Sequence, residues 1–181
     1  MKNYRLLLIP IILIIMVTGF LLLSKKTPRK EPGGSLVNPG PQVQSCNVVL
    51  YFINEKYADT GNENIPHLLP ETRKLKTGCL AETAVLELQR GTKRADLSTA
   101  IRPDLKILGV ITQSKIAFVN FSSVNLHGGS LEERMILEQI IATLTGLEGI
   151  EKVQFLVDGK NTETLMGHYD ITRPFDRTDK L

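Results

Sequence analysis

The chain has 181 residues, of which 42% are hydrophobic and 23% charged, and its formal net charge is +3. This length predicts one ordinary domain plus an appendage, with enough chain to bury a core. The charge is uneven, because residues 1–44 hold six Lys or Arg and one acid, Glu31, which leaves the rest at about −2. The chain has no tryptophan, and no aromatic residues are interleaved among basic ones, so we expect no nucleic-acid partner.

Leu6–Leu23 is an uncharged apolar run. At about 1.5 Å per residue it covers roughly 27 Å, close to the hydrocarbon thickness of a bilayer. We predict a membrane anchor over residues 1–24, in contact with the bilayer through residues 6–23. The alternative is a cleaved signal peptide, although this run is longer than such a signal needs. Lipidation is not expected, because the first cysteine, Cys46, lies far beyond the run.

Residues 25–44 form a predicted linker that is basic and rich in proline and glycine. Its basic cluster lies where anionic headgroups would be, or is a solvated flank of the anchor. Basic residues stand on both sides of the anchor, so charge alone does not fix its orientation.

The predicted domain covers residues 45–177. It opens with Asn47–Ile53, which is apolar on both faces and is therefore predicted to be a central strand. Residues 54–70 are predicted to form a long loop, and Thr72–Lys76 a second strand. Leu80–Gln89 has the periodicity of a short helix. The polar stretch 92–104 is predicted to be another loop.

The two cysteines, Cys46 and Cys79, flank this first pair of strands. If the strands pair antiparallel, the start of one lies beside the end of the other and the cysteines approach. A disulfide is then an option outside the cytoplasm, and two half-buried free thiols are the alternative. The spacing is not that of a zinc site.

Residues 106–112 and 115–121 are predicted to be strands of a hairpin joined at Gln113-Ser114. A helix follows from about Leu131 to a stop at Gly146. Its start has the capping-box spacing, in which Ser130 and Glu133 would each satisfy a backbone N–H.

Val153, Phe155 and Val157 alternate with polar residues, which predicts a last strand. An extended edge segment is expected around Tyr169–Ile171, and a frayed tail over residues 178–181. Together these elements predict an α+β fold: a two-layer sandwich in which two helices pack on one face of a small, mainly antiparallel sheet.

Several of these segments resemble the GerMN domain family, named for the GerM sporulation and spore germination protein. The similarity covers roughly residues 46–177 and rests on Val119-Asn120-Phe121-Ser122-Ser123, Gly128-Gly129-Ser130-x-Glu132-Glu133, Thr143-Leu144-Thr145, Phe155-Leu156-Val157-Asp158-Gly159, Gly167-His168-x-Asp170 and Arg173-Pro174. The resemblance implies a domain on the outer side of the membrane, similar to the ring-building modules of envelope complexes. One copy of the module is visible, whereas many relatives carry two.

The residues that could carry chemistry are few. His67, His127 and His168 have no metal-ligand spacing with one another, and His168 with Asp170 is better explained as a surface pair. Gly128-Gly129-Ser130 could face an anion, but the predicted cap and nearby glutamates oppose this. No nucleophile motif is present, so we expect no catalytic residue, metal or cofactor.

The sequence therefore predicts a non-enzymatic module anchored in a bacterial cell membrane, outside the cytoplasm. It would assemble with itself or with other envelope proteins, in sporulation, germination or another envelope process. The alternative is a tethered module that binds cell wall or a small ligand.

Overall fold

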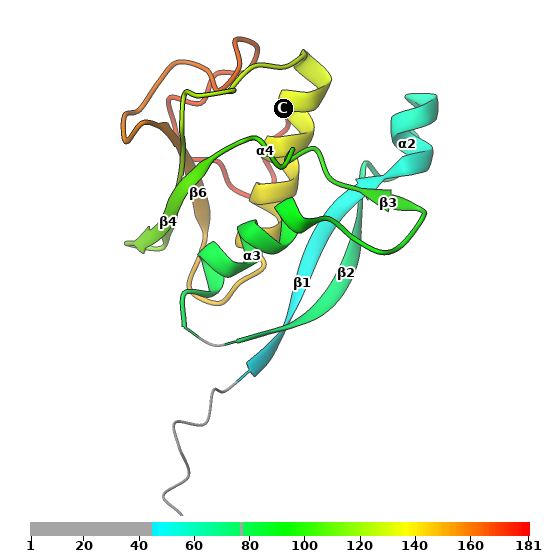
Figure 1. The fold of residues 1–181 in the computed structure, drawn as a ribbon, viewed down its shortest axis with the longest axis horizontal. Coiled ribbons are helices and arrows are strands. Elements are labelled where there is room, and N and C mark those ends of the chain that lie inside the picture. Colours follow the sequence, from blue (N-terminus) through cyan, green and yellow to red (C-terminus); the bar gives the residue numbers. More distant parts are fainter. Residues whose placement is uncertain (1–44, 77) are drawn as a thin grey trace, which may run out of the picture. The chain divides into compact units, whose positions relative to one another are not determined.

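The computed structural model describes residues 45–76 and 78–181 (Figure 1). The predicted anchor, residues 1–24, and the predicted linker, residues 25–44, lie outside this part of the chain. Within the described part, no helix has both the length and the apolar character that crossing a bilayer requires. The described chain forms these elements in order: β1 (Ser45–Asn54), α2 (Glu55–Thr60), β2 (Leu68–Lys76), α3 (Leu80–Arg90), β3 (Leu97–Ser98), β4 (Ile107–Gln113), β5 (Ile116–Phe121), α4 (Ser130–Leu144) and β6 (Lys152–Val157).

The first sheet has the strand order β2-β1-β3. Its central strand is β1, as predicted, since β1 pairs with β2 on one side and β3 on the other, and Leu50 and Phe52 on it are completely buried. β1 and β2 pair antiparallel from Ser45 opposite Lys76 to Ile53 opposite Leu68, so the condition under which the two cysteines would approach is met. β3 reaches only the last two residues of β1, so most of that side of β1 has no partner strand among the described residues.

Helix α4 supplies the missing partners at Tyr51. The backbone N–H of Tyr51 donates to Thr143 Oγ1 at 3.0 Å, and its carbonyl oxygen accepts from Gln139 Nε2 at 3.2 Å. Both helix residues are fully buried. Buried backbone groups need such partners, so two polar side chains of α4 continue the sheet's hydrogen bonding where β3 ends.

The second sheet has the order β4-β5-β6. The predicted hairpin is confirmed, with its turn one residue later, at Ser114 and Lys115, whose φ angles are +50° and +66°. Positive φ at both turn residues matches the twist of a two-residue hairpin. β5 and β6 run parallel and are connected through α4, which makes a strand-helix-strand crossover.

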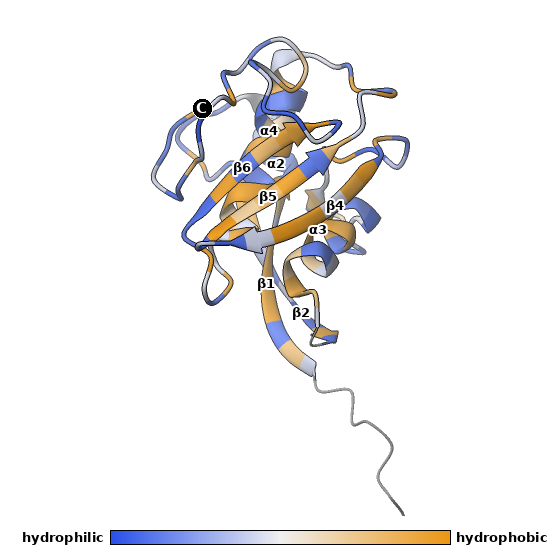
Figure 2. Ribbon diagram, turned by 90° about the vertical axis from the view of Figure 1, so that its left-hand side faces the viewer, coloured by the Kyte–Doolittle hydropathy of each residue, from blue (hydrophilic) through white to orange (hydrophobic). Residues whose placement is uncertain are grey.

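The helices α3 and α4 lie between the two sheets (Figures 1 and 2). α4 is buried on several sides, with Gln139 and Thr143 toward β1 and other side chains toward β6. The α+β class is confirmed. The single predicted sheet is instead two small sheets, one on each side of the helices.

The core joins the two sheets through the helices. Its largest fully buried side chains are Phe52, Phe121, Phe155, Leu50, Leu88, Ile101, Leu105, Ile136, Leu137, Ile140, Leu144 and Ile171. Burial of such side chains contributes about 1.5–3 kcal/mol each, so the domain has a substantial core of its own.

Three segments differ from the sequence prediction. The loop predicted over 54–70 contains α2, which begins after Asn54, where the side chain accepts from Lys56 N–H, and ends at Gly61 in the left-handed region. The loop predicted over 92–104 contains β3. The tail lies against the domain rather than fraying, because Asp179 accepts hydrogen bonds from Arg173 and the chain packs its last residue on the core.

Candidate functional site

Glu133 is a carboxylate in the first turns of α4 and is fully buried. Its Oε1 accepts from the backbone N–H groups of Leu165 at 3.0 Å and Met166 at 2.9 Å. Its Oε2 accepts from the N–H of His168 at 2.9 Å. Three donors satisfy the buried charge, so this carboxylate fastens the segment 165–168 to the helix and is not placed for acid-base chemistry.

The predicted capping box is therefore wrong. α4 begins at Ser130, its N-cap is Gly129, and no side chain caps the helix start. Glu133 points to the C-terminal segment, because three backbone donors there satisfy a carboxylate better than one local donor at the helix start. Sequence spacing alone could not reveal those distant donors.

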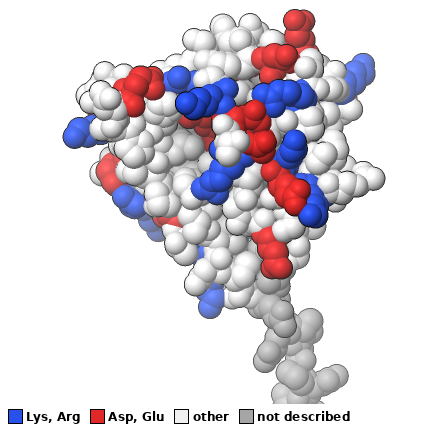
Figure 3. Space-filling view, turned by 180° about the vertical axis from the view of Figure 1, so that it is seen from behind, with Lys and Arg blue, Asp and Glu red and all other residues white. Residues whose placement is uncertain are grey.

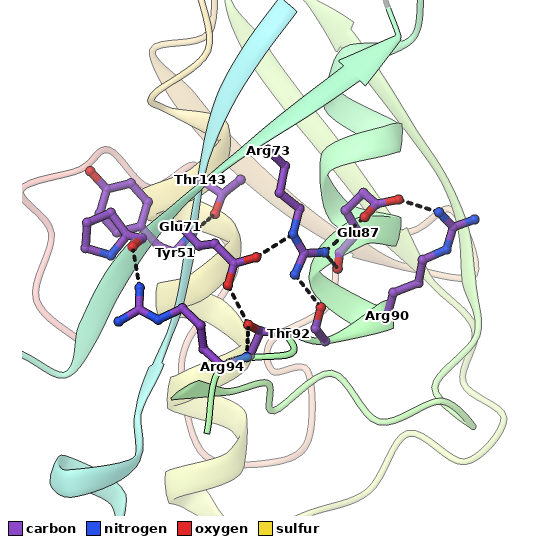
Figure 4. Close-up of polar contacts among 10 residues, drawn as sticks. Tyr51, Glu71, Arg73, Glu87, Arg90, Thr92, Arg94 and Thr143 are labelled. Carbon is purple, nitrogen blue, oxygen red and sulfur yellow. Dashed lines mark hydrogen bonds and ion pairs between the residues drawn. The ribbon is translucent and has the colours of Figure 1, made fainter. Parts of the chain in front are cut away.

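A second polar cluster surrounds Arg73 on β2 (Figure 4). Its Nε donates to Glu71 Oε1 at 2.7 Å and its Nη1 to Glu87 Oε2 at 3.0 Å. Its Nη2 donates to the carbonyl oxygen of Gly91 at 2.6 Å, and the guanidinium lies 4.9 Å from the ring centre of Phe52. The guanidinium thus ties β2 to α3 and covers part of the core.

Neighbouring side chains close this cluster. The hydroxyl of Thr92 donates to Glu71 Oε2, Arg90 pairs with Glu87, and Arg94 Nη1 donates to the carbonyl of Pro70 at 3.3 Å. A cavity of about 410 Å³ lies among these groups. These charged groups pair with one another. The cluster therefore stabilises the contact of β2 with α3 and with the segment that follows α3.

A third cluster centres on His67, just before β2. Its Nε2 lies 2.7 Å from Glu63 Oε2 and its Nδ1 lies 3.1 Å from Glu138 Oε2. The imidazole stacks on Tyr57 with ring centres 4.1 Å apart, and Arg134 of α4 contacts the Tyr57 hydroxyl. These contacts fix the segment before β2 to both α2 and α4.

Electrostatics in this cluster shift the pKa values of Tyr57 and Glu63 in opposite directions. Burial raises the pKa of Tyr57, and its hydrogen bond to Glu63 raises it further. Hydrogen bonds from His67 and Tyr57 lower the pKa of Glu63. Tyr57 therefore stays protonated and Glu63 ionised, which suits a structural clamp. An adjoining cavity of about 490 Å³ is lined by side chains of both charges, including Glu138 and Arg177.

The most exposed apolar side chains of the second sheet lie on β4. Ile111 is 65% exposed and Leu108 is 45% exposed. Leu108 sits at an irregularity in the ladder, where the β4–β5 register shifts between Ile107 and Gly109. β4 pairs only with β5 among the described residues, and Figure 2 shows this apolar sheet uncovered on the side facing the viewer. Exposed apolar residues on a strand with an unpaired edge are typical of a binding surface.

The side seen from behind Figure 1, at a right angle to the β4 face shown in Figure 2, carries many charged side chains. Figure 3 shows acidic and basic groups intermingled on that side, without a patch of one sign. The β4 surface is therefore the candidate functional site, and sequence reasoning missed it because exposure depends on what the tertiary fold leaves uncovered.

Of the other residues singled out from the sequence, Cys79 lies beside β4, in a cavity that Ile111 also lines, and the rest lie apart from that surface. Cys46 is half-buried, Cys79 is exposed, and both are free thiols in the structure, so their disulfide stays a prediction. His168 Nε2 lies 3.2 Å from the carbonyl of Gly128, whereas Asp170 accepts from Thr172 instead. His168 and Asp170 therefore do not form a pair. Within the described chain, no cluster of three or more metal-ligating side chains is present.

Comparison with known proteins identifies the family to which the chain belongs. The family described as "Germane: Sporulation and spore germination" matches residues 49–163. The first GerMN domain of the sporulation protein GerM from Bacillus subtilis is similar in structure, with a TM-score of 0.61 and 20% identity over 74% of this chain and 99% of that chain. The tandem GerMN domains of the same protein give a TM-score of 0.56 and 19% identity, over 82% of this chain and 49% of that chain. No curated protein matches the sequence.

At these identities the two solved structures establish the fold, and they agree with the resemblance to GerMN domains seen in the sequence. The family match extends over well more than half of the chain. The protein belongs to the Germane family of sporulation and spore germination proteins.

Proposed function

We propose that this protein is a membrane-tethered, extracytoplasmic module that acts in sporulation or spore germination by binding other proteins. The observation that carries the proposal is the β4 surface, where Ile111 and Leu108 are exposed on a strand that has no partner at one edge among residues 45–76 and 78–181. An apolar strand edge of this kind favours association with another polypeptide chain.

A non-catalytic role is supported by how the polar groups are used. Glu133 is saturated by three backbone donors, and His67 lies between two carboxylates and a tyrosine ring. Arg73 is held by two carboxylates and a carbonyl. Groups engaged in this way stabilise the domain, because their polar atoms already bind other parts of the same chain.

Tethering is supported by the sequence, through the apolar run Leu6–Leu23 and the basic linker that follows. Confinement to a membrane surface raises the local concentration of the domain, so contacts of modest affinity become effective.

The experiment uses the full-length chain with a C-terminal tag in sporulating bacteria. We expect the protein in the membrane fraction, digestible by protease added outside the cytoplasm, and cross-linked to at least one other protein through the domain. A chain lacking residues 6–23 should leave the membrane fraction. Recovery of the intact protein in the cytosol, or turnover of a substrate by the purified chain, would contradict the proposal.

A second candidate function is binding of wall polymer or a small ligand. The observation that favours it is the cavity of about 490 Å³ near Glu138 and Arg177, which offers both charges. Sedimentation of the full-length protein with purified cell wall separates the two candidates. Capture by wall with no protein cross-link would favour the ligand-binding module, and Glu138→Gln with Arg177→Gln should then abolish the capture.

A further inference from the structure

β4 differs from the other long edges of the two sheets. It contains no charged residue and no proline, which are the usual protections against pairing with another chain. β2, the corresponding edge of the first sheet, carries Pro70, Lys74 and Lys76. The outer side of β6 is bridged by Phe175, which exchanges backbone hydrogen bonds with Val153 at 2.8 Å. Of these edges, β4 is the one without such protection, whereas the lysines of β2 oppose pairing unless the partner edge lies beside acidic groups.

The hairpin geometry tells which backbone groups of β4 are available. Gln113 and Ile116 flank the two-residue turn, so they form a hydrogen-bonded pair, and the alternation of an antiparallel ladder makes Ile111 with Phe118 another. The N–H and C=O groups of the intervening residues, Val110 and Thr112, therefore point away from β5. Their side chains lie on the inner face of the sheet, because the residues opposite them on β5 are buried.

A groove of about 660 Å³ runs beside this edge, between β4, the start of α3 and the segment 147–150. Its apolar lining includes Leu80 and Ile150, and the charged residues of the described chain that line it are Glu82 and Glu148. Glu82 is close to the strand, since its Oε1 lies 3.8 Å from the position that a Cβ on Gly109 would take. The groove therefore suits a strand with basic side chains on the face that enters it.

The edge of β2 has that character. In the β1–β2 ladder, the N–H of Asn54 donates to the carbonyl of His67, so the alternation directs the backbone groups of Thr72, Lys74 and Lys76 away from β1. The side chains of these three residues are exposed on the outer face of the first sheet.

We propose that β2 of one copy adds antiparallel to β4 of a second copy, in a head-to-tail contact. Directly opposed residues of an antiparallel pair place their side chains on the same face. With Lys76 opposite Val110 and Lys74 opposite Thr112, both lysines enter the groove that holds Glu82. The helices of the two copies then lie on opposite faces of the joined sheet and do not collide.

The same reasoning disfavours a twofold pairing of β4 with β4. The side chains of Val110 and Thr112 of both copies would then lie on the same face of the joined sheet. This arrangement places the two acidic grooves side by side, with Glu82 and Glu148 of one copy near Glu82 and Glu148 of the other. Like charges across an interface oppose association. The head-to-tail contact also leaves a β2 edge and a β4 edge unused at the two ends, so it can propagate into a ring or filament.

This contact rests on the proposed assembly function and specifies its geometry. The test uses the full-length chain in detergent with Cys46→Ser and Cys79→Ser. One preparation carries Lys74→Cys and another Thr112→Cys, and the two are oxidised separately and as a mixture. Opposed Cα atoms in such a pair are about 5.5 Å apart, within disulfide range, so we expect a cross-linked dimer from the mixture alone. As the matched control, Lys56→Cys on α2 should give no dimer when mixed with Thr112→Cys.

A charge-swap series tests the same contact without cysteines. Lys74→Glu with Lys76→Glu should weaken self-association in sedimentation at least about tenfold, because four like charges then meet in the groove. Mixing that chain with one carrying Glu82→Lys and Glu148→Lys should restore association of the two variants. This rescue shows that loss of association in either variant is not loss of folding.

Two results would overturn the inference: absence of a cross-link in the Lys74→Cys and Thr112→Cys mixture, or a dimer from Ile111→Cys alone, which indicates the twofold pairing. Either result leaves the proposed function standing if the wild-type chain still cross-links to other proteins in sporulating cells. Failure of that cellular cross-link, with the β2–β4 contact intact in detergent, would instead count against the proposed function.

Discussion

The carboxylate of Glu133 and the backbone N–H of His168 lie 2.9 Å apart, although 35 positions separate them in the sequence. The contact fixes the long segment after β6 to the first turns of α4, and two more N–H groups of the same segment, from Leu165 and Met166, converge on this carboxylate. One side chain therefore holds the C-terminal part of the domain against its central helix.

Glu133→Ala should lower the free energy of unfolding by about 3 kcal/mol, because it leaves three N–H groups without their charged acceptor in a buried place. Chemical denaturation measures the loss, and amide hydrogen exchange should speed up first at residues 165–168. Glu163→Ala, an exposed acid in the same segment, is the control and should change stability little. Unchanged exchange at 165–168 in the Glu133 variant would contradict the clamp.

Thr143→Val should lower the free energy of unfolding by about 1–2 kcal/mol, because the buried N–H of Tyr51 loses its acceptor while the shape of the side chain is kept. Thr83→Val, the same substitution at a half-buried position of α3, is the control and should change stability less. Equal losses for the two variants, measured by urea unfolding, would show that α4 does not complete the hydrogen bonding of β1.

Stability should depend on pH through Glu71. Burial alone would raise the pKa of this carboxyl, but hydrogen bonds from Thr92 and Arg73 outweigh it and the pKa is lowered. A carboxyl with a lowered pKa in the folded state contributes stability above its unfolded pKa of about 4.3, and the contribution is lost as pH falls through the folded pKa.

Glu71→Gln should therefore be less stable than wild type by about 1 kcal/mol at pH 7, and this difference should begin to shrink as the pH falls below the unfolded pKa of about 4.3. Urea unfolding of both proteins from pH 7 to pH 3 tests the expectation. A difference that stays constant over this range would mean that the charge of Glu71 does not contribute.

The two thiols should react at different rates in the folded protein. Cys79 is exposed and Cys46 is half-buried on β1, so an alkylating reagent should modify Cys79 first. Mass spectrometry of digested samples measures both rates, and Cys46→Ser should leave one thiol with the faster rate. Faster modification of Cys46 would indicate that β1 opens at its start. If neither thiol of protein recovered from cells reacts before reduction, the predicted disulfide forms in the cell.

The local sequence pattern was sufficient to predict most helices and strands of the domain. Alternation predicted the strands on either side of Ser114, and apolar spacing predicted the helices that begin near Leu80 and Leu131. Motif order in the same segments was enough to indicate the family, which the family match confirmed. The short helix α2 was missed because a one-turn apolar pattern cannot be distinguished from a loop rich in Asn and Asp.

Contacts between distant segments were decided by the tertiary structure alone. Glu133 was predicted to cap the helix, but it binds backbone N–H groups that lie 32 to 35 positions away in the sequence. No rule based on local spacing includes such partners. The division into two sheets, and the exposure of Ile111 on β4, likewise depend on which surfaces the fold brings together and which it leaves uncovered. Hydrophobic periodicity predicts which face of a helix or strand is apolar. The packing of the elements in three dimensions decides whether another part of the chain covers that face.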